Sequence, residues 1–191
     1  MSRHVHRVQK MLRAVGFPTL TDGKPGPQTR EHIRQFQRGL AFTELPVDGK
    51  CPRLSRTYYR LRRASKDGGR ASEHFYFREC ASRGNGDIKL DRRLVLGLEK
   101  YRERVGHAVR IVSGHRDPMH NRRVGGAECS RHSDVCDNPG GEAADLEPEL
   151  PLREVKALDC FTGLGYEPSG KVRHVDVRHG STRTPTVWRY G

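Results

Sequence analysis

The fold of this chain is decided by three short stretches of sequence, Ser130-Arg131-His132, Gly141-Glu142-Ala143-Ala144-Asp145 and Val172-Arg173-His174-Val175-Asp176. Each stretch contains a histidine or an aspartate that can bind a metal ion. Two imidazoles and one carboxylate can hold a catalytic zinc ion, because the fourth coordination position then stays open for water or substrate. The sequence therefore predicts a Zn2+ site, provided that the folded chain brings these three side chains together.

The last of these stretches lies in a predicted strand in which apolar and polar residues alternate. Val175 and Val177 share one face of this strand, which we expect to pack in the core. His174, Asp176 and Arg178 share the other face, because successive side chains of a strand point to opposite sides. The strand can therefore bury its valines while it presents His174 to a cleft.

Residues 72–191 as a whole predict an α+β domain. A helical pattern begins after Asp91, a favourable N-cap, and ends before Gly106, a favourable C-cap. Residues 108–112 predict a strand, and a short helix is expected around residues 152–158.

Residues 1–63 predict a separate domain of three helices. Apolar residues recur at intervals of three and four, as one face of a helix requires. They are Val8, Met11, Leu12 and Val15, then Ile33, Phe36 and Leu40, and finally Tyr58 and Leu61. The turns Asp22-Gly23 and Asp48-Gly49 separate the helices. Residues 64–71 are basic, contain glycine and lack periodicity, so we expect a linker there.

The charge of the chain is concentrated in its first third. The net charge is +13, and residues 1–70 carry 16 Lys and Arg against 5 Asp and Glu. Such a surface favours a polyanionic partner, although charge alone does not distinguish DNA, RNA, acidic lipid and anionic wall polymers. No aromatic residues interleave the basic residues of the linker, which argues against a nucleic-acid partner. We also expect no membrane span and no secretory signal, because the chain has no suitable apolar run.

The five cysteines include no Cys-x-x-Cys pair, so a four-cysteine zinc site is not expected. Cys129 and Cys136 bracket His132 closely enough to form a small disulfide loop. Free buried thiols are the alternative, and the sequence does not choose between them.

The N-terminal unit resembles the small peptidoglycan-binding helical domain that is often attached to cell-wall enzymes. The residues that carry the resemblance are Val8-Gln9, Leu12, Gly16-Phe17, Asp22-Gly23, Gly26-Pro27, Thr29, Ile33, Phe36-Gln37 and Leu45-Pro46-Val47-Asp48-Gly49. This resemblance implies that bacterial peptidoglycan is the partner.

The second domain resembles the D-Ala-D-Ala metallopeptidase family, which includes zinc D,D-carboxypeptidases and many phage endolysins and shares its fold with the hedgehog signalling domain. The matching motifs are Ser113-Gly114-His115-Arg116, Asn121-Arg122-Arg123-Val124-Gly125-Gly126, Ser130-Arg131-His132, Gly141-Glu142-Ala143-Ala144-Asp145 and His174-Val175-Asp176. The resemblance implies a small antiparallel sheet flanked by helices, with zinc held by His132, Asp145 and His174. It also implies that Arg116 binds a carboxylate of the peptide stem, for which a structural ion pair is the alternative.

The sequence departs from this family in two places. His132 and Asp145 are thirteen positions apart, where the family has seven, so we expect a loop insertion at residues 133–140. If the insertion is not a loop, Asp134 or Asp137 would be the substitute ligand. The second departure is Lys171, which stands three residues before His174, where several branches carry an acidic base.

The general base is therefore open between Asp176 and Glu167, with His115 a weaker candidate. Asp176 shares the strand face of His174 and could instead orient a metal ligand. Glu167 lies in the preceding loop and could reach the attacking water to accept its proton.

Together these features predict a two-domain, monomeric peptidoglycan hydrolase that cleaves a peptide bond of the stem or cross-bridge, as a carboxypeptidase or an endopeptidase. We expect a phage endolysin, made in the host cytoplasm without a signal peptide and acting at the cell wall. A processed form of a secreted bacterial enzyme is one alternative. A non-catalytic wall-binding protein that keeps the zinc fold is another, and a nucleic-acid-binding protein is the least favoured.

Overall fold

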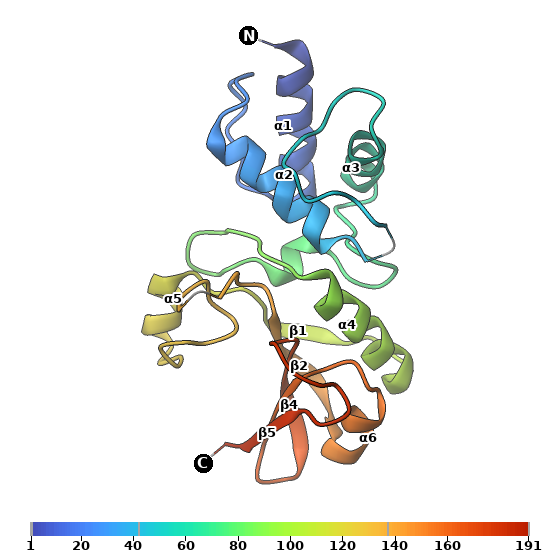
Figure 1. Cartoon of the computed structure of the whole chain (residues 1–191), viewed down its shortest axis with the longest axis vertical. Helices are drawn as coiled ribbons and strands as arrows, with labels where there is room; N and C mark the ends of the chain where they lie inside the picture. Colours follow the sequence, from blue (N-terminus) through green and yellow to red (C-terminus); the bar gives the residue numbers. More distant parts are fainter. Residues whose placement is uncertain (1, 42, 137, 191) are drawn as a thin grey trace.

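The computed structural model describes residues 2–41, 43–136 and 138–190. The elements in chain order are α1 (Arg3–Val15), α2 (Pro27–Gly39), α3 (Arg56–Lys66), the short 3-10 helix η1 (Phe77–Cys80), α4 (Arg92–Val105), β1 (Arg110–Ser113), α5 (Pro118–Arg123), β2 (Ala143–Pro151), α6 (Leu152–Ala157), β3 (Gly163–Tyr166), β4 (Lys171–Asp176) and β5 (Thr186–Arg189). Figure 1 shows the three N-terminal helices at one end of the molecule and the sheet at the other. The predicted α+β fold with a helical N-terminal domain is confirmed. No described helix has the length and apolar character needed to span a bilayer.

The helices begin and end at residues with the expected capping chemistry. The side chains of Ser55 and Asp91 accept hydrogen bonds from the first turns of α3 and α4. Gly16 and Gly106 end α1 and α4 in the left-handed conformation, with φ of 119° and 77°. Glycine adopts this conformation without the steric cost that a Cβ brings, and α4 ends where the sequence predicts.

A buried glutamine holds the first turn of the N-terminal domain against its helices. Gln9 is fully buried, and its Nε2 donates to Asp22 Oδ1 (2.8 Å), the carbonyl of Lys24 (3.0 Å) and Thr29 Oγ1 (3.1 Å). Its Oε1 accepts from the backbone N–H of Gly23 (2.8 Å). One side chain thus connects α1, the Asp-Gly turn and α2.

Gln37 repeats this arrangement one helix later. Its Nε2 donates to Asp48 Oδ1 (2.9 Å), the carbonyl of Lys50 (3.2 Å) and Thr57 Oγ1 (3.1 Å). Its Oε1 accepts from the N–H groups of Asp48 and Gly49. The N-terminal domain is therefore built from two half-repeats, each organised by one buried glutamine.

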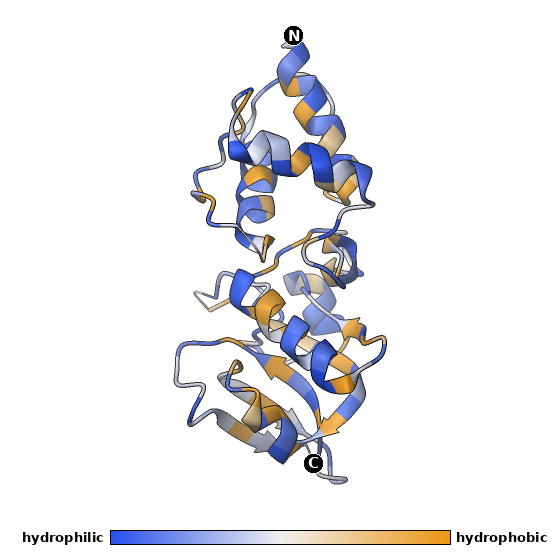
Figure 2. Ribbon diagram, turned by 90° about the vertical axis from the view of Figure 1, so that its right-hand side faces the viewer, coloured by the Kyte–Doolittle hydropathy of each residue, from blue (hydrophilic) through white to orange (hydrophobic). Residues whose placement is uncertain are grey.

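The helical domain packs directly on the second domain. The ring of Phe77 in η1 lies 5.5 Å from that of Phe17 and 5.4 Å from that of Phe36, measured between ring centroids. Of the expected linker at residues 64–71, the first three residues form the last turn of α3, and Ala71 is buried. In Figure 2 the two domains are stacked along the long axis, and hydrophobic residues recur among hydrophilic ones in both.

The second domain contains a five-stranded sheet, in which the strands have the order β1-β2-β4-β3-β5. Neighbouring strands are antiparallel, as expected, except that β5 runs parallel to β3. Asp176 at the end of β4 and Thr186 at the start of β5 both pair with Gly163 of β3, so the connection passes β3 at one end of the sheet and β5 runs in the direction of β3. Helices α4 and α6 contact β2, and their buried side chains, such as Leu98 and Val155, join the core with Val175 and Val177.

Asp117 fixes the start of α5, a helix that the sequence did not predict. Its carboxylate accepts hydrogen bonds from the N–H groups of Met119 (3.1 Å) and His120 (3.0 Å), from Ser82 Oγ (2.7 Å) and from the N–H of Asn85 (3.1 Å). Burial alone would raise the pKa of Asp117, but these hydrogen bonds lower it to about 2. The carboxylate therefore joins α5 to the loop that precedes α4.

We expect Asp117→Ala to lower the free energy of unfolding by about 2 kcal/mol at pH 7, the upper range for loss of an N-cap. The pKa is lower in the folded state, so the contribution is complete above the ordinary value of 3.8 and is lost as the pH falls towards 2. Denaturant unfolding at several pH values measures this. A difference between the two proteins that does not shrink at low pH would contradict the assignment.

Candidate metal centre

One row of residues crosses the whole sheet and carries the centre of the site. Ser113 on β1 pairs with Asp145 on β2, and Asp145 pairs with His174 on β4. His174 pairs in turn with Gly165 on β3, which pairs with Trp188 on β5. Residues in register on adjacent strands point to the same face. The register therefore sets Asp145 and His174 side by side, although they are far apart in the sequence.

The predicted trio of His132, Asp145 and His174 converges on this face. His132 Nε2 lies 3.0 Å from His174 Nδ1 and 3.2 Å from Asp145 Oδ1, and the last two atoms are 3.1 Å apart. All three residues are buried. They are the one group of histidine, cysteine or acidic side chains with metal-site spacing in the described part of the chain.

Backbone contacts orient His132, which lies in a loop. Its Nδ1–H donates a hydrogen bond to the carbonyl of Gly114 (2.7 Å), which leaves Nε2 with a free lone pair. Its carbonyl accepts hydrogen bonds from the N–H of Arg116 (2.8 Å) and from Nδ1 of His115 (3.0 Å). Burial lowers the pKa of His115 to about 4, so its imidazole is a neutral donor here. His115 is not among the residues that line the cavity described below.

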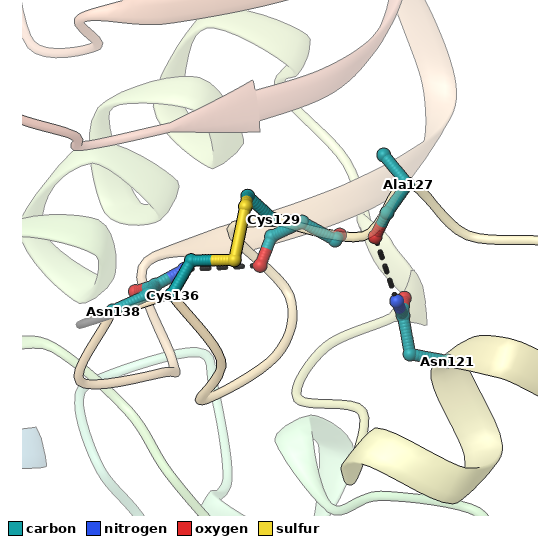
Figure 3. The surroundings of a disulfide bond; sticks show 6 residues. Asn121, Ala127, Cys129, Cys136 and Asn138 are labelled. Atoms are coloured by element: carbon teal, nitrogen blue, oxygen red, sulfur yellow. Dashed lines mark hydrogen bonds between the residues drawn. A yellow bond between two sulfur atoms is a disulfide. The ribbon is translucent and has the colours of Figure 1, made fainter.

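The described residues of the insertion, 133–136 and 138–140, lie in a loop that a disulfide and a side-chain hydrogen bond hold in place. A disulfide joins Cys129 and Cys136 on either side of His132, and the side-chain amide of Asn138 donates to the carbonyl of Ser130 (3.0 Å). Figure 3 shows both connections. Of the two alternatives for these cysteines, the structure has the disulfide.

The insertion contains the two acidic residues that were considered as substitute ligands, Asp134 and Asp137. Asp134 forms an ion pair with Lys89 and is not part of the trio. Asp137 lies outside the described residues. Asp145 itself reaches the two histidines, so the longer spacing does not separate it from them.

Asp176 contacts Nε2 of His174, whereas the other two candidate ligands lie at Nδ1 of the same ring. Its Oδ2 is 3.2 Å from His174 Nε2, and both its oxygens accept from Arg178 Nε (2.8 and 3.0 Å). Asp176 is fully buried, and a Cβ on Gly163 of the neighbouring strand would lie 2.3 Å from its carboxylate. This geometry favours the second of its two predicted roles, in which it orients His174.

The ionisation of these groups favours an added cation. Burial would raise the pKa of Asp145, but its close contacts with His132 and His174 hold it well below its usual range. Burial lowers the pKa of His132, which keeps its imidazole neutral, as metal binding requires. Burial acts the same way on His174, but hydrogen bonds with Asp145 and Asp176 outweigh it and raise its pKa. A positive charge is thus stabilised between these side chains.

The donor set also fits zinc in its dimensions. In a tetrahedral site with bonds of about 2.0–2.1 Å, neighbouring ligand atoms lie about 3.3 Å apart. The three separations of 3.0–3.2 Å observed here are close to that edge length. Two imidazole nitrogens and one carboxylate oxygen are donors that zinc accepts.

The trio lies in a cavity of about 680 Å³ that is open to solvent. Glu167, Arg173 and Trp188 are among the residues that line it, and so is Arg116. Arg116 Nη2 lies 2.7 Å from Oδ2 of Asp145, the oxygen that does not face the histidines. This contact favours the structural ion pair as the role of Arg116.

Residues 78–176 match the sequence model of Peptidase M15, which is about half of the chain. The chain belongs to the Peptidase M15 family. Residues 2–51 match the model of a peptidoglycan binding domain, so the binding domain precedes the M15 domain. Peptidases of the M15 family are metallopeptidases and are typically zinc-dependent. A comparison with curated proteins gave no significant match.

Two features of the M15 domain were not predicted. Trp188 folds over Gly165, where a Cβ would lie 2.9 Å from the indole, and its ring is 5.2 Å from that of His174. Arg173 is the extra residue of a β-bulge in β4. Glycines at alternate positions of a strand, as in Gly163-Leu164-Gly165, signal that something approaches the backbone closely, and this was the available clue.

We expect Asp176→Asn to weaken zinc binding by the M15 domain about 10- to 100-fold, because the side chain that orients His174 loses its charge. Competition with a chromophoric chelator measures the affinity. Asp134→Asn is the matched control, since it removes a carboxylate of the insertion that is paired with Lys89. An equal loss in this control would mean that the insertion supplies a ligand.

Proposed function

We propose that this protein is a zinc-dependent peptidoglycan hydrolase that cleaves a peptide bond in the stem or cross-bridge of the bacterial cell wall. The observation that carries the proposal is the convergence of two imidazole nitrogens and one carboxylate oxygen in an open cavity of an M15 domain. The peptidoglycan-binding domain in the same chain supports the wall as substrate.

In this proposal His132, Asp145 and His174 hold the zinc ion. When bound, zinc supplies Lewis-acid activation of the scissile carbonyl and of the attacking water. Apart from Asp145, Glu167 is the one carboxylate among the described residues that line the cavity. We therefore assign to Glu167 the role of the base that accepts the proton of the water. Asp176 is assigned the orientation of His174 through Nε2.

The N-terminal domain would hold the enzyme on its insoluble substrate. Residues 1–70 carry most of the net positive charge, and wall polymers with phosphate or carboxylate groups are anionic. Attraction between exposed charges is screened by salt, so binding to purified walls should weaken as ionic strength rises.

We further propose that the enzyme acts as a phage endolysin. A peptidoglycan-binding domain joined closely to an M15 domain in the same chain supports this role. Expression in bacteria with and without a pore-forming holin tests it. Lysis that requires the holin supports an endolysin, and lysis without it supports an enzyme that reaches the wall by another route.

A non-catalytic wall-binding protein is the second candidate. The observation that favours it is Lys171, which stands where several branches of the family carry an acidic base. A zymogram on purified cell walls separates the two candidates. We expect clearing by the zinc-loaded protein, loss of clearing with a chelator and recovery when zinc is added back. Wall binding without clearing would support the second candidate. Mass spectrometry of the released muropeptides identifies the bond that is cut.

A further inference from the structure

Three of the four arginines among the described residues that line the cavity are already engaged by buried carboxylates, and one of them is Arg131, whose Nη1 donates to Glu142 Oε2 (3.4 Å). Arg116 donates from Nη2 to Asp145 (2.7 Å) and from Nε to Ser113 Oγ (2.8 Å). Arg178 donates from Nε and Nη2 to Asp176, and its guanidinium also lies 4.9 Å from the centre of the Trp188 ring. These two side chains support the candidate metal ligands, and a substrate carboxylate would have to compete with those contacts.

Arg173 is different, because its guanidinium is mostly free. Its one side-chain hydrogen bond within the described chain joins Nη1 to Glu167 Oε1 at 3.3 Å. Half of its side chain (51%) is exposed, against 16% for Arg116. Nε and Nη2 therefore remain as the two parallel donors that a carboxylate binds most strongly.

The backbone explains why Arg173 reaches the cavity at all. Regular alternation would point it away from the face that carries His174. In the pairing of β3 with β4, however, Gly165 faces His174 and Tyr166 faces Val172, so Arg173 is left as an unpaired extra residue. A bulge of this kind re-aims a side chain, and both Arg173 and His174 line the cavity as a result.

We infer that Arg173 binds a carboxylate of the substrate next to the scissile bond, and that the cavity therefore selects acidic peptides. This inference rests on the proposed function. It assigns the carboxylate-binding role to Arg173, whereas Arg116 positions Asp145. The long contact between Arg173 and Glu167 leaves room for a second carboxylate on the same guanidinium.

The test uses two synthetic stem peptides, one with free carboxylates and one with the matching carboxamides. The zinc-loaded wild type should prefer the acidic peptide in kcat/KM and should bind the acidic cleavage product more tightly by calorimetry. In Arg173→Gln this preference should fall about ten- to hundredfold, the value of a hydrogen-bonded pair between charged groups. Arg173→Lys should recover only part of it, because an ammonium lacks the planar fork.

Arg110→Gln is the matched control, since Arg110 pairs with Glu147 on the surface of the same sheet and does not line the cavity. It removes the same charge and should keep the preference of the wild type. If Arg173→Gln keeps the preference, or if the wild type has none, the inference is overturned while wall hydrolysis still stands. If the zinc-loaded wild type cleaves neither the peptides nor purified walls, the proposed function itself fails.

Discussion

His174→Ala is expected to abolish hydrolysis of purified cell walls and to leave binding to them intact. The side chain supplies one of three candidate ligand atoms, and its Nδ1 lies 3.0–3.1 Å from the other two. Removal of a residue that only orients a ligand weakens metal binding by up to roughly hundredfold. Removal of His174, a candidate ligand, should weaken zinc binding by more than this. Turbidity loss of a wall suspension measures hydrolysis, and co-sedimentation with the walls measures binding.

A thermal-shift measurement separates metal loss from misfolding in this variant. A ligand that binds only the folded state at 100 times its Kd stabilises it by about 2.7 kcal/mol. Zinc should therefore raise the Tm of the wild type and leave that of His174→Ala unchanged. His179→Ala is the control, because His179 is exposed and lies outside the trio. Clearing of walls by His174→Ala at the wild-type rate would exclude the proposed metal centre.

Gln37→Ala is expected to destabilise the N-terminal domain by about 3 kcal/mol, because buried hydrogen-bonding groups lose their partner. Gln37 is fully buried, and its side chain makes five hydrogen bonds with α3 and the segment that leads into it. Denaturant unfolding followed by circular dichroism measures the change. Binding to walls should fall under conditions in which the variant domain unfolds, since the folded domain is proposed to hold them.

Gln28→Ala provides the comparison for this effect. Gln28 is exposed on the same helix, and its Oε1 accepts one hydrogen bond from the N–H of Leu20 (3.0 Å). An exposed bond of this kind contributes little, so the change should stay within about 0.5 kcal/mol. Equal destabilisation by the two variants would mean that the buried network contributes no more to the free energy of unfolding than one exposed hydrogen bond.

The features that sequence reasoning found are those that depend on neighbours along the chain. Helix caps such as Asp91 and Gly106 act within one turn, and amphipathic spacing identifies the buried face of each helix. The candidate ligands were found because the motifs around them resemble a known family. Both kinds of signal can be read without knowing which strands pair.

The features that were missed depend on partners distant in sequence. Regular alternation was expected through residues 172–178, but Arg173 is a bulge because of how β4 pairs with β3. The approach of Trp188 to His174 requires β5 to lie beside β3, and β5 is a short strand with no strong pattern of its own. The two glutamine networks were visible as a repeat of Asp-Gly turns, but nothing local indicated that Gln9 and Gln37 would be buried.

The row that joins Asp145 to His174 couples assembly of the sheet to assembly of the site. A shift of one residue in the pairing of β2 with β4 would turn one of these side chains to the opposite face and expose a valine of the core. A misassembled sheet could then retain neither its hydrophobic packing nor its affinity for a divalent ion. A divalent ion would accordingly bind and stabilise only a sheet with the native register. Metal uptake during refolding would therefore report that β2 and β4 have paired correctly.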